Sequence, residues 1–107
     1  MTSVNDKWIT YMGFARKSGN LLWGSNTLLY SLSSSRKPYL VIICDEVGEN
    51  TRKKILKACD KAHVMCLQKG SCATLSERLG LIDKGVFGIS DENLAKAIIS
   101  SLELNNL

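Results

Sequence analysis

The sequence predicts a single-domain three-layer α/β/α sandwich with a small mixed central sheet of about four strands. Residues 39–44 form an apolar run without alternation, which is typical of a central strand covered on both faces. Short apolar runs alternate with segments of helical periodicity along the whole chain. A length of 107 residues and a hydrophobic content of 45% suffice for one core. We therefore expect one domain over residues 1–107.

The first third of the chain contains two predicted helices. The first helix has one apolar stripe, and Ser3 or Asn5 is its expected cap. The stripe consists of Val4, Trp8, Tyr11, Met12 and Ala15. Residues 20–23 form a short apolar segment, after which Ser25 or Asn26 is expected to cap the second helix. The core side of that helix carries Leu28, Leu29 and Leu32.

The helix after the central strand is amphipathic, with an apolar side and a lysine-rich outer side. Its predicted core residues are Ile55, Leu56, Cys59 and Ala62, and its outer lysines are Lys53, Lys54, Lys57 and Lys61. Residues 63–67 and 86–89 are strand-like, and residues 74–79 form a short helix that ends at Gly80. Residues 90–92 are expected to cap the final helix. The buried side of this helix consists of Leu94, Ala95, Ile98, Ile99 and Leu102.

Charge and hydropathy restrict the class of partner. Fourteen Lys and Arg against ten Asp and Glu give a net charge of +4, which allows a polyanionic partner. No apolar run approaches the roughly 18 residues of a membrane span, and residues 1–7 lack a signal-peptide core. We therefore expect a cytoplasmic protein without a membrane partner.

The four cysteines are unevenly spaced and form no C-x-x-C pair, so we interpret all of them as reduced thiols and expect no metal or cofactor. Cys44, Asp45 and His63 are the one nucleophile, acid and base set that an enzyme could use. Cys44, however, continues the apolar run and is interpreted as buried and inert. There is no Walker sequence and no G-x-G-x-x-G. We expect no enzymatic activity.

Three loops adjoin helix starts and are expected to meet at one end of the sandwich: residues 22–27, 45–50 and 69–75. In open α/β folds ligands bind near strand ends and helix N-termini, where free N–H groups and the helix dipole favour an anion such as phosphate. The alternative is that Gly24 and Gly48 only supply turn geometry and that Ser25 or Asn26 only caps a helix.

Several segments together resemble a known family. They are Lys7-Trp8-Ile9, Gly13-Phe14-Ala15-Arg16-Lys17-Ser18-Gly19, Leu40-Val41-Ile42-Ile43, Glu49-Asn50-Thr51-Arg52-Lys53-Lys54, the stretch from Leu75 to Gly80, and Asp91 with Leu94-Ala95-Lys96. In this order they resemble the bacterial YlxQ proteins, small relatives of the ribosomal proteins L-seven-Ae and L-thirty-e. The resemblance covers nearly the whole chain, and no single segment is diagnostic.

The resemblance implies a monomeric α/β/α protein that binds structured RNA, typically kink-turns, near the ribosome or its proteins, and that catalyses no reaction. In relatives, Gly-Thr-Asn-Glu begins the second helix and a Lys follows one turn later. The corresponding residues here are Gly24, Ser25, Asn26, Thr27 and Tyr30. Thr27 has no carboxylate to accept from guanine, and Tyr30 has no ammonium to pair with phosphate. A protein-interaction module that has lost kink-turn recognition is therefore the alternative.

The resemblance also implies further RNA contacts. Glu46, Val47 and Gly48 would lie between the two family contact regions, with Val47 offering an exposed apolar surface to a base or sugar. Leu75, beside the loop of Lys69, either lies against an extruded nucleotide or packs on its own domain.

Aromatic and basic residues have similar alternatives. Trp23 either stacks on a base or packs in the core. The basic residues could follow a phosphate backbone, although each taken alone could simply be solvated. Those included in the expected RNA surface are Arg16, Lys17, Lys37 and Arg52.

Overall fold

The computed structural model describes residues 7–105. The helices are α1 (Lys7–Lys17), α2 (Ser25–Ser33), α3 (Glu49–Ala62), α4 (Cys72–Leu79) and α5 (Glu92–Asn105), and the strands are β1 (Leu21–Trp23), β2 (Leu40–Ile43), β3 (Met65–Gln68) and β4 (Val86–Ile89). The expected cap at Ser3 or Asn5 and the apolar role of Val4 lie outside the described residues.

The four strands form one mixed sheet in the order β1-β4-β2-β3. β4 is antiparallel to both of its neighbours, with Leu22 opposite Gly88 on one side and Val41 opposite Gly88 on the other. β2 and β3 are parallel, with Leu40 opposite Met65. All four residues of β2 and all four of β4 are buried, as the unbroken apolar run at residues 39–44 predicts for a central strand. The predicted mixed four-stranded sheet is confirmed.

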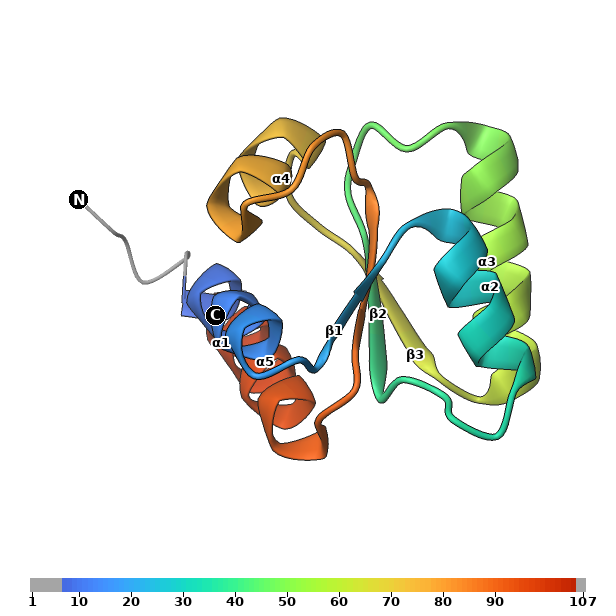
Figure 1. Ribbon diagram of the computed structural model, residues 1–107, viewed down its shortest axis with the longest axis horizontal. Helices are drawn as coiled ribbons and strands as arrows, with labels where there is room; N and C mark the ends of the chain where they lie inside the picture. Colours follow the sequence, from blue (N-terminus) through green and yellow to red (C-terminus); the bar gives the residue numbers. More distant parts are fainter. Residues whose placement is uncertain (1–6, 106–107) are drawn as a thin grey trace.

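Helices cover both faces of the sheet, which Figure 1 shows edge-on with α1, α4 and α5 on one side and α2 and α3 on the other. Successive residues of β2 point to opposite faces, so Leu40 and Ile42 pack with Phe87 and the first group of helices. Val41 and Ile43 pack with α2 and α3 in a second cluster. The three-layer sandwich is thereby confirmed. No helix in the described part of the chain has both the length and the apolar character to cross a bilayer.

Predictions for individual helices were partly wrong. The cap of α2 is Gly24 with φ 95°, and no side chain caps the helix, because both Ser25 and Asn26 are already inside it. Leu56 is 45% exposed, since it lies about 100° around the helix from the buried Ile55.

Two element boundaries also differ from those expected. α4 begins two residues earlier than predicted because Ser71 caps it by accepting the N–H of Thr74 at 3.0 Å. β3 begins at Met65 because His63, with φ 58°, is the left-handed residue that ends α3.

The side chain of Phe87, in the inner strand β4, should contribute strongly to stability. Phe87 is fully buried, so Phe87→Ala should lower the free energy of unfolding by about 3–5 kcal/mol, measured by urea denaturation. Phe14→Ala is the matched control because Phe14 is 50% exposed, and it should cost less than about 1 kcal/mol. Equal losses in the two variants would contradict this assignment of the core.

Candidate nucleic-acid interface

Three loops meet at the end of the sheet where β2 and β3 finish and β4 begins. The N–H of Gly24 donates to the carbonyl of Val86 at 3.0 Å, and that of Cys44 donates to Gly85 at 2.9 Å. The N–H of Asp45 donates to the carbonyl of Gly70 at 2.8 Å. These bonds continue the strand pairing past the ends of the strands and join the start of α2 to the loops before β4, after β2 and after β3 (Figure 1).

A surface hollow of about 220 Å³ lies where these loops meet, and we call it the upper hollow. It is lined by Gly24, Ser25, Val47, Thr51, Asp83, Lys84, Gly85 and Val86. The predicted meeting of the α2 start with the loop after β2 is therefore present. The loop before β4 is a third wall that the sequence-based reasoning did not include.

The start of α2 leaves polar groups facing outward. The N–H groups of its first turn have no partner inside the helix, because intrahelical bonding begins with Leu28 donating to Gly24 at 3.1 Å. Asn26 and Thr27 are exposed and Ser25 is half-exposed. Within residues 7–105 the side chains of these three residues make no hydrogen bond. The helix dipole adds positive potential here, so an anion can be bound by backbone and side chains together.

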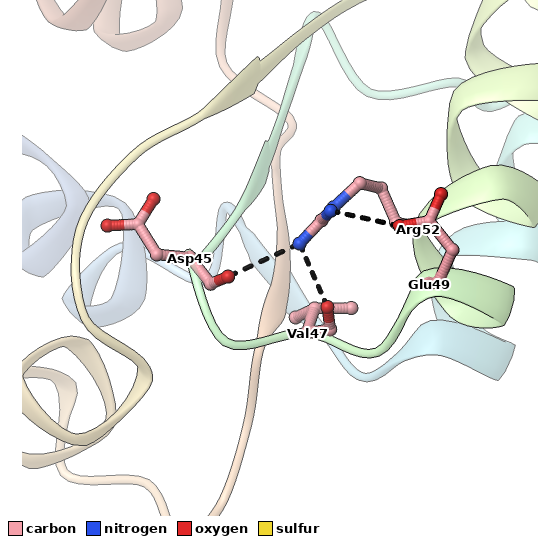
Figure 2. Close-up of polar contacts among 4 residues, drawn as sticks. All are labelled: Asp45, Val47, Glu49 and Arg52. Atoms are coloured by element: carbon pink, nitrogen blue, oxygen red, sulfur yellow. Dashed lines mark hydrogen bonds and ion pairs between the residues drawn. The ribbon is translucent and has the colours of Figure 1, made fainter.

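Arg52 holds the loop after β2 from inside, as Figure 2 shows. Its Nη2 donates to the carbonyl oxygens of Asp45 at 3.2 Å and of Val47 at 3.0 Å, and Nη1 pairs with Glu49 at 3.3 Å. Its side chain is only 22% exposed. The predicted phosphate contact by Arg52 does not match this arrangement, because the guanidinium is directed at the protein backbone.

Glu46 and Val47 are also used by the fold. The Glu46 carboxylate accepts the N–H of Cys72 at 2.7 Å and so satisfies a free donor at the start of α4. Val47 is half-buried and packs against both core clusters. A Cβ on Gly85 would lie 2.6 Å from its Cγ2, so the two residues are in close contact. Val47 therefore exposes less apolar surface than expected, while Gly48 is exposed beside it.

Cys44 and Cys72 are joined by a disulfide, with their Cα atoms 5.2 Å apart. The expectation of reduced thiols is wrong for this pair. The two residues are 28 positions apart, and only the fold brings the end of β2 against the start of α4. The disulfide lies beneath the upper hollow, because a Cβ on Gly85 would be 3.1 Å from Cys44 Sγ and 3.4 Å from Cys72 Sγ.

Cys59 and Cys66 are free, as expected for reduced thiols. Their side chains are hydrogen-bonded, which raises the pKa of Cys66 and lowers that of Cys59, and burial raises the pKa of Cys66 further. One group in the described residues has ligand atoms close enough for a metal, the two sulfurs of the disulfide and a Glu46 oxygen, all within 4.8 Å. Because the sulfurs are bonded to each other they are not thiolates, and this form does not offer a zinc site.

Two residues of the expected surface are buried or covered. Leu75 is fully buried, so it packs on its own domain, which was the alternative to a nucleotide contact. Trp23 is half-buried against the core, and the Arg16 guanidinium lies 4.7 Å from its ring centroid. Arg16 also donates from Nε to the carbonyl of Leu79 at 2.8 Å. Trp23 thus packs against the core, which was one of its two expected roles. The guanidinium of Arg16 contacts groups of its own protein.

The remaining predicted residues lie apart from the upper hollow. Lys69 lines a different hollow with Leu67 and Leu102. Lys17 is exposed at the end of α1. Tyr30 and Lys37 line a large hollow near the other end of α2.

Lys84, Asp83 and Gly85 were missed by the sequence-based reasoning. Ser76, which is buried, holds this loop by accepting the N–H of Lys84 at 3.0 Å and donating to its carbonyl at 2.9 Å. The short run Asp83-Lys84-Gly85 before a buried strand was the signal available in the sequence.

The structure does not bring together the nucleophile, acid and base set of Cys44, Asp45 and His63. Cys44 is in the disulfide and follows β2, whereas His63 precedes β3. Since β2 and β3 are parallel and in register, the two residues lie at opposite ends of the sheet, separated by about six residue positions or roughly 20 Å along the strands.

Comparisons with known proteins agree with this fold. No family model matches the chain. The chain is 24% identical to the RNA-binding protein YlxQ of Bacillus subtilis (strain 168) over 97 residues, which are 91% of this chain and 96% of that protein. It is 29% identical to the RNA-binding protein YlxQ of Enterococcus faecium over 90 residues, 84% and 85% of the two chains. The resemblance to the YlxQ proteins is confirmed.

Two solved structures share the fold of this chain. A protein of unknown function from Bacillus halodurans superposes with a TM-score of 0.85 at 23% identity, covering 91% of this chain and 97% of that one. The 15.5kD RNA binding protein of Giardia lamblia superposes with a TM-score of 0.73 at 16% identity, covering 96% and 88%.

Removing the Arg52 guanidinium should loosen the loop after β2. Arg52→Gln leaves the carbonyls of Asp45 and Val47 without this donor, so stability should fall by about 1–3 kcal/mol. Amide hydrogen exchange over residues 45–48 should become faster. Lys53→Gln removes a neighbouring exposed charge and should leave both quantities unchanged. Unaltered exchange in Arg52→Gln would show that the contact does not order the loop.

The disulfide should be detectable and stabilising. Alkylation of the unfolded, unreduced protein should label two cysteines, Cys59 and Cys66. Because the bridge closes a loop with a sequence separation of 28, Cys72→Ala should lose about 3–4 kcal/mol in urea denaturation under oxidising conditions. Cys66→Ala, which breaks no bridge, is the control. Labelling of all four cysteines without reductant would refute the disulfide.

Proposed function

We propose that this protein binds structured RNA through a surface made of the start of α2, residues 45–48 and residues 83–85. The observation that carries this proposal is the upper hollow, which Lys84 and the unbonded Ser25 both line. The exposed Asn26 follows Ser25 in the first turn of α2. The names of the two YlxQ relatives, which align with most of this chain, support RNA as the ligand class.

Each part of this surface has a chemical task. The free N–H groups at the α2 start and the Ser25 hydroxyl bind phosphate oxygens. The Asn26 amide can donate to and accept from a base edge. Lys84 supplies a positive charge. Gly24 lets the RNA backbone approach closely because it lacks a side chain.

Asp83 supplies a group that the α2 start lacks. At the position where kink-turn-binding relatives carry an acid, this chain has Thr27, which cannot accept a hydrogen bond as a carboxylate does. Asp83 lines the same hollow from the loop before β4. We propose that it accepts from the exposed N–H groups of guanine in its place, so that kink-turn-like RNA remains the ligand.

This function requires no catalysis and no cofactor. We propose that residues 1–107 act as one monomeric domain in the cytoplasm, on ribosomal or other kink-turn-like RNA near the translation machinery. The alternative of a protein-interaction module predicts a protein partner that co-purifies after ribonuclease treatment. The polar groups at the α2 start favour the RNA proposal.

Asn26→Ala should weaken the binding of a kink-turn hairpin about tenfold, because two hydrogen bonds to RNA are lost. The dissociation constant should be measured by fluorescence anisotropy over a range of salt, and the affinity should fall linearly on logarithmic axes. Lys84→Gln should reduce the salt slope by about one.

Lys61→Ala is the control, since Lys61 is exposed near the end of α3 and lines a different hollow. Lys61→Ala should leave the dissociation constant of the kink-turn hairpin unchanged. Binding without a salt slope, or wild-type affinity in Asn26→Ala, would show that the surface is wrongly placed.

A further inference from the structure

A second and larger hollow, of about 770 Å³, lies near the other end of α2, and we call it the lower hollow. Two exposed aromatic rings border it, Tyr30 at 78% and Tyr39 at 52% exposure. Arg36 and Lys37 are both exposed and also line it, and no acidic residue does. Its other lining residues are four serines and Leu22. The proposed function uses none of these groups.

The wall of the lower hollow is held in place by its own hydrogen bonds. The buried Ser31 hydroxyl donates to the carbonyl of Arg36 at 2.7 Å, and the N–H of Arg36 donates to the Ser34 hydroxyl at 3.0 Å. The backbone of Tyr39 is held just before the inner strand β2, where its N–H donates to the carbonyl of Ile89 at 2.8 Å. The segment that carries the cations and the ring is therefore organised before any ligand arrives, which reduces the ordering cost of binding.

The chemistry of the lining selects one class of ligand. Exposed aromatic rings beside cations bind single-stranded nucleic acid, because bases stack on the rings and phosphates pair with the charges. Serine hydroxyls can bond to phosphate, ribose or base groups. Without an acid in the lining, nothing repels a polyanion. A paired duplex would not present its base faces to Tyr30 and Tyr39, so the strand must be unpaired.

We propose that the lower hollow binds unpaired nucleotides of the same RNA whose structured part occupies the upper hollow. This inference rests on the proposed function and adds the class of RNA, a structured element with a single-stranded extension. α2 connects the two hollows, and its nine residues span about 13 Å, the length of roughly four stacked nucleotides. Tyr30 lies one helical turn beyond Asn26, on the route between them.

The test compares one kink-turn hairpin without a tail and with eight unpaired uridines at its 5′ or 3′ end. Anisotropy gives the dissociation constant of the full chain for each RNA at one salt concentration. At least one tail should tighten binding about fivefold or more, since a single stacked base contributes at least this factor. A tail of eight abasic residues retains the phosphates and should give a smaller gain.

Variants of the protein show which residues produce the increase in affinity that the uridine tail causes. Tyr39→Ala should abolish most of it, Tyr39→Phe should retain it, and Arg36→Gln should reduce it. Phe14→Ala and Lys7→Gln are matched controls that remove a half-exposed ring and an exposed charge on α1, and both should retain it. All five variants should bind the untailed hairpin as wild type does.

Each outcome decides the inference. It is overturned if neither uridine tail tightens binding, if the abasic tail gives an equal gain, or if the gain survives in Tyr39→Ala. Failure of the untailed hairpin to bind overturns the proposed function, and the inference falls with it. Normal binding of the untailed hairpin without any gain from the tails rejects the inference alone.

Discussion

The backbone hydrogen bonds that join the loops at the end of the sheet are the constraint on which the rest of the structure depends. Gly24 and Cys44 donate to adjacent residues at the start of β4, and Asp45 donates to the loop after β3. The positions at which α2, α3 and α4 begin are therefore fixed relative to one another. These bonds continue the pairing of the central strands, whose residues are fully buried and closely packed. The packing of the central strands thus determines the positions of the loops that form the surface.

Polar side chains around these loops divide into two groups by direction. Arg52, Glu46 and Ser76 are directed at backbone groups of their own fold and satisfy them. Asn26 and Thr27 point outward and bond to nothing in the described residues. The first group sets the shape of the surface and the second supplies its chemistry. A charged residue near a binding surface therefore need not contact the ligand, as Arg52 illustrates.

The sequence predicted the architecture well because apolar periodicity reports burial directly. The unbroken run at residues 39–44 identified a strand covered on both faces, and the helical stripe of Trp8 and Met12 is buried. The site was predicted only in part. Whether Arg52 faces solvent or its own loop, and whether Cys44 meets Cys72, depends on contacts between residues distant in sequence. No local pattern contains that information.

The cap of α2 has a consequence for how this protein could acquire new specificity. Because Gly24 ends the preceding turn with its backbone alone, the helix needs no side chain from Ser25, Asn26 or Thr27 to begin. The fold therefore places almost no demand on these positions. Substitutions at these positions can change which ligand is recognised without lowering stability. The ligand preference can therefore change during evolution while the fold stays the same.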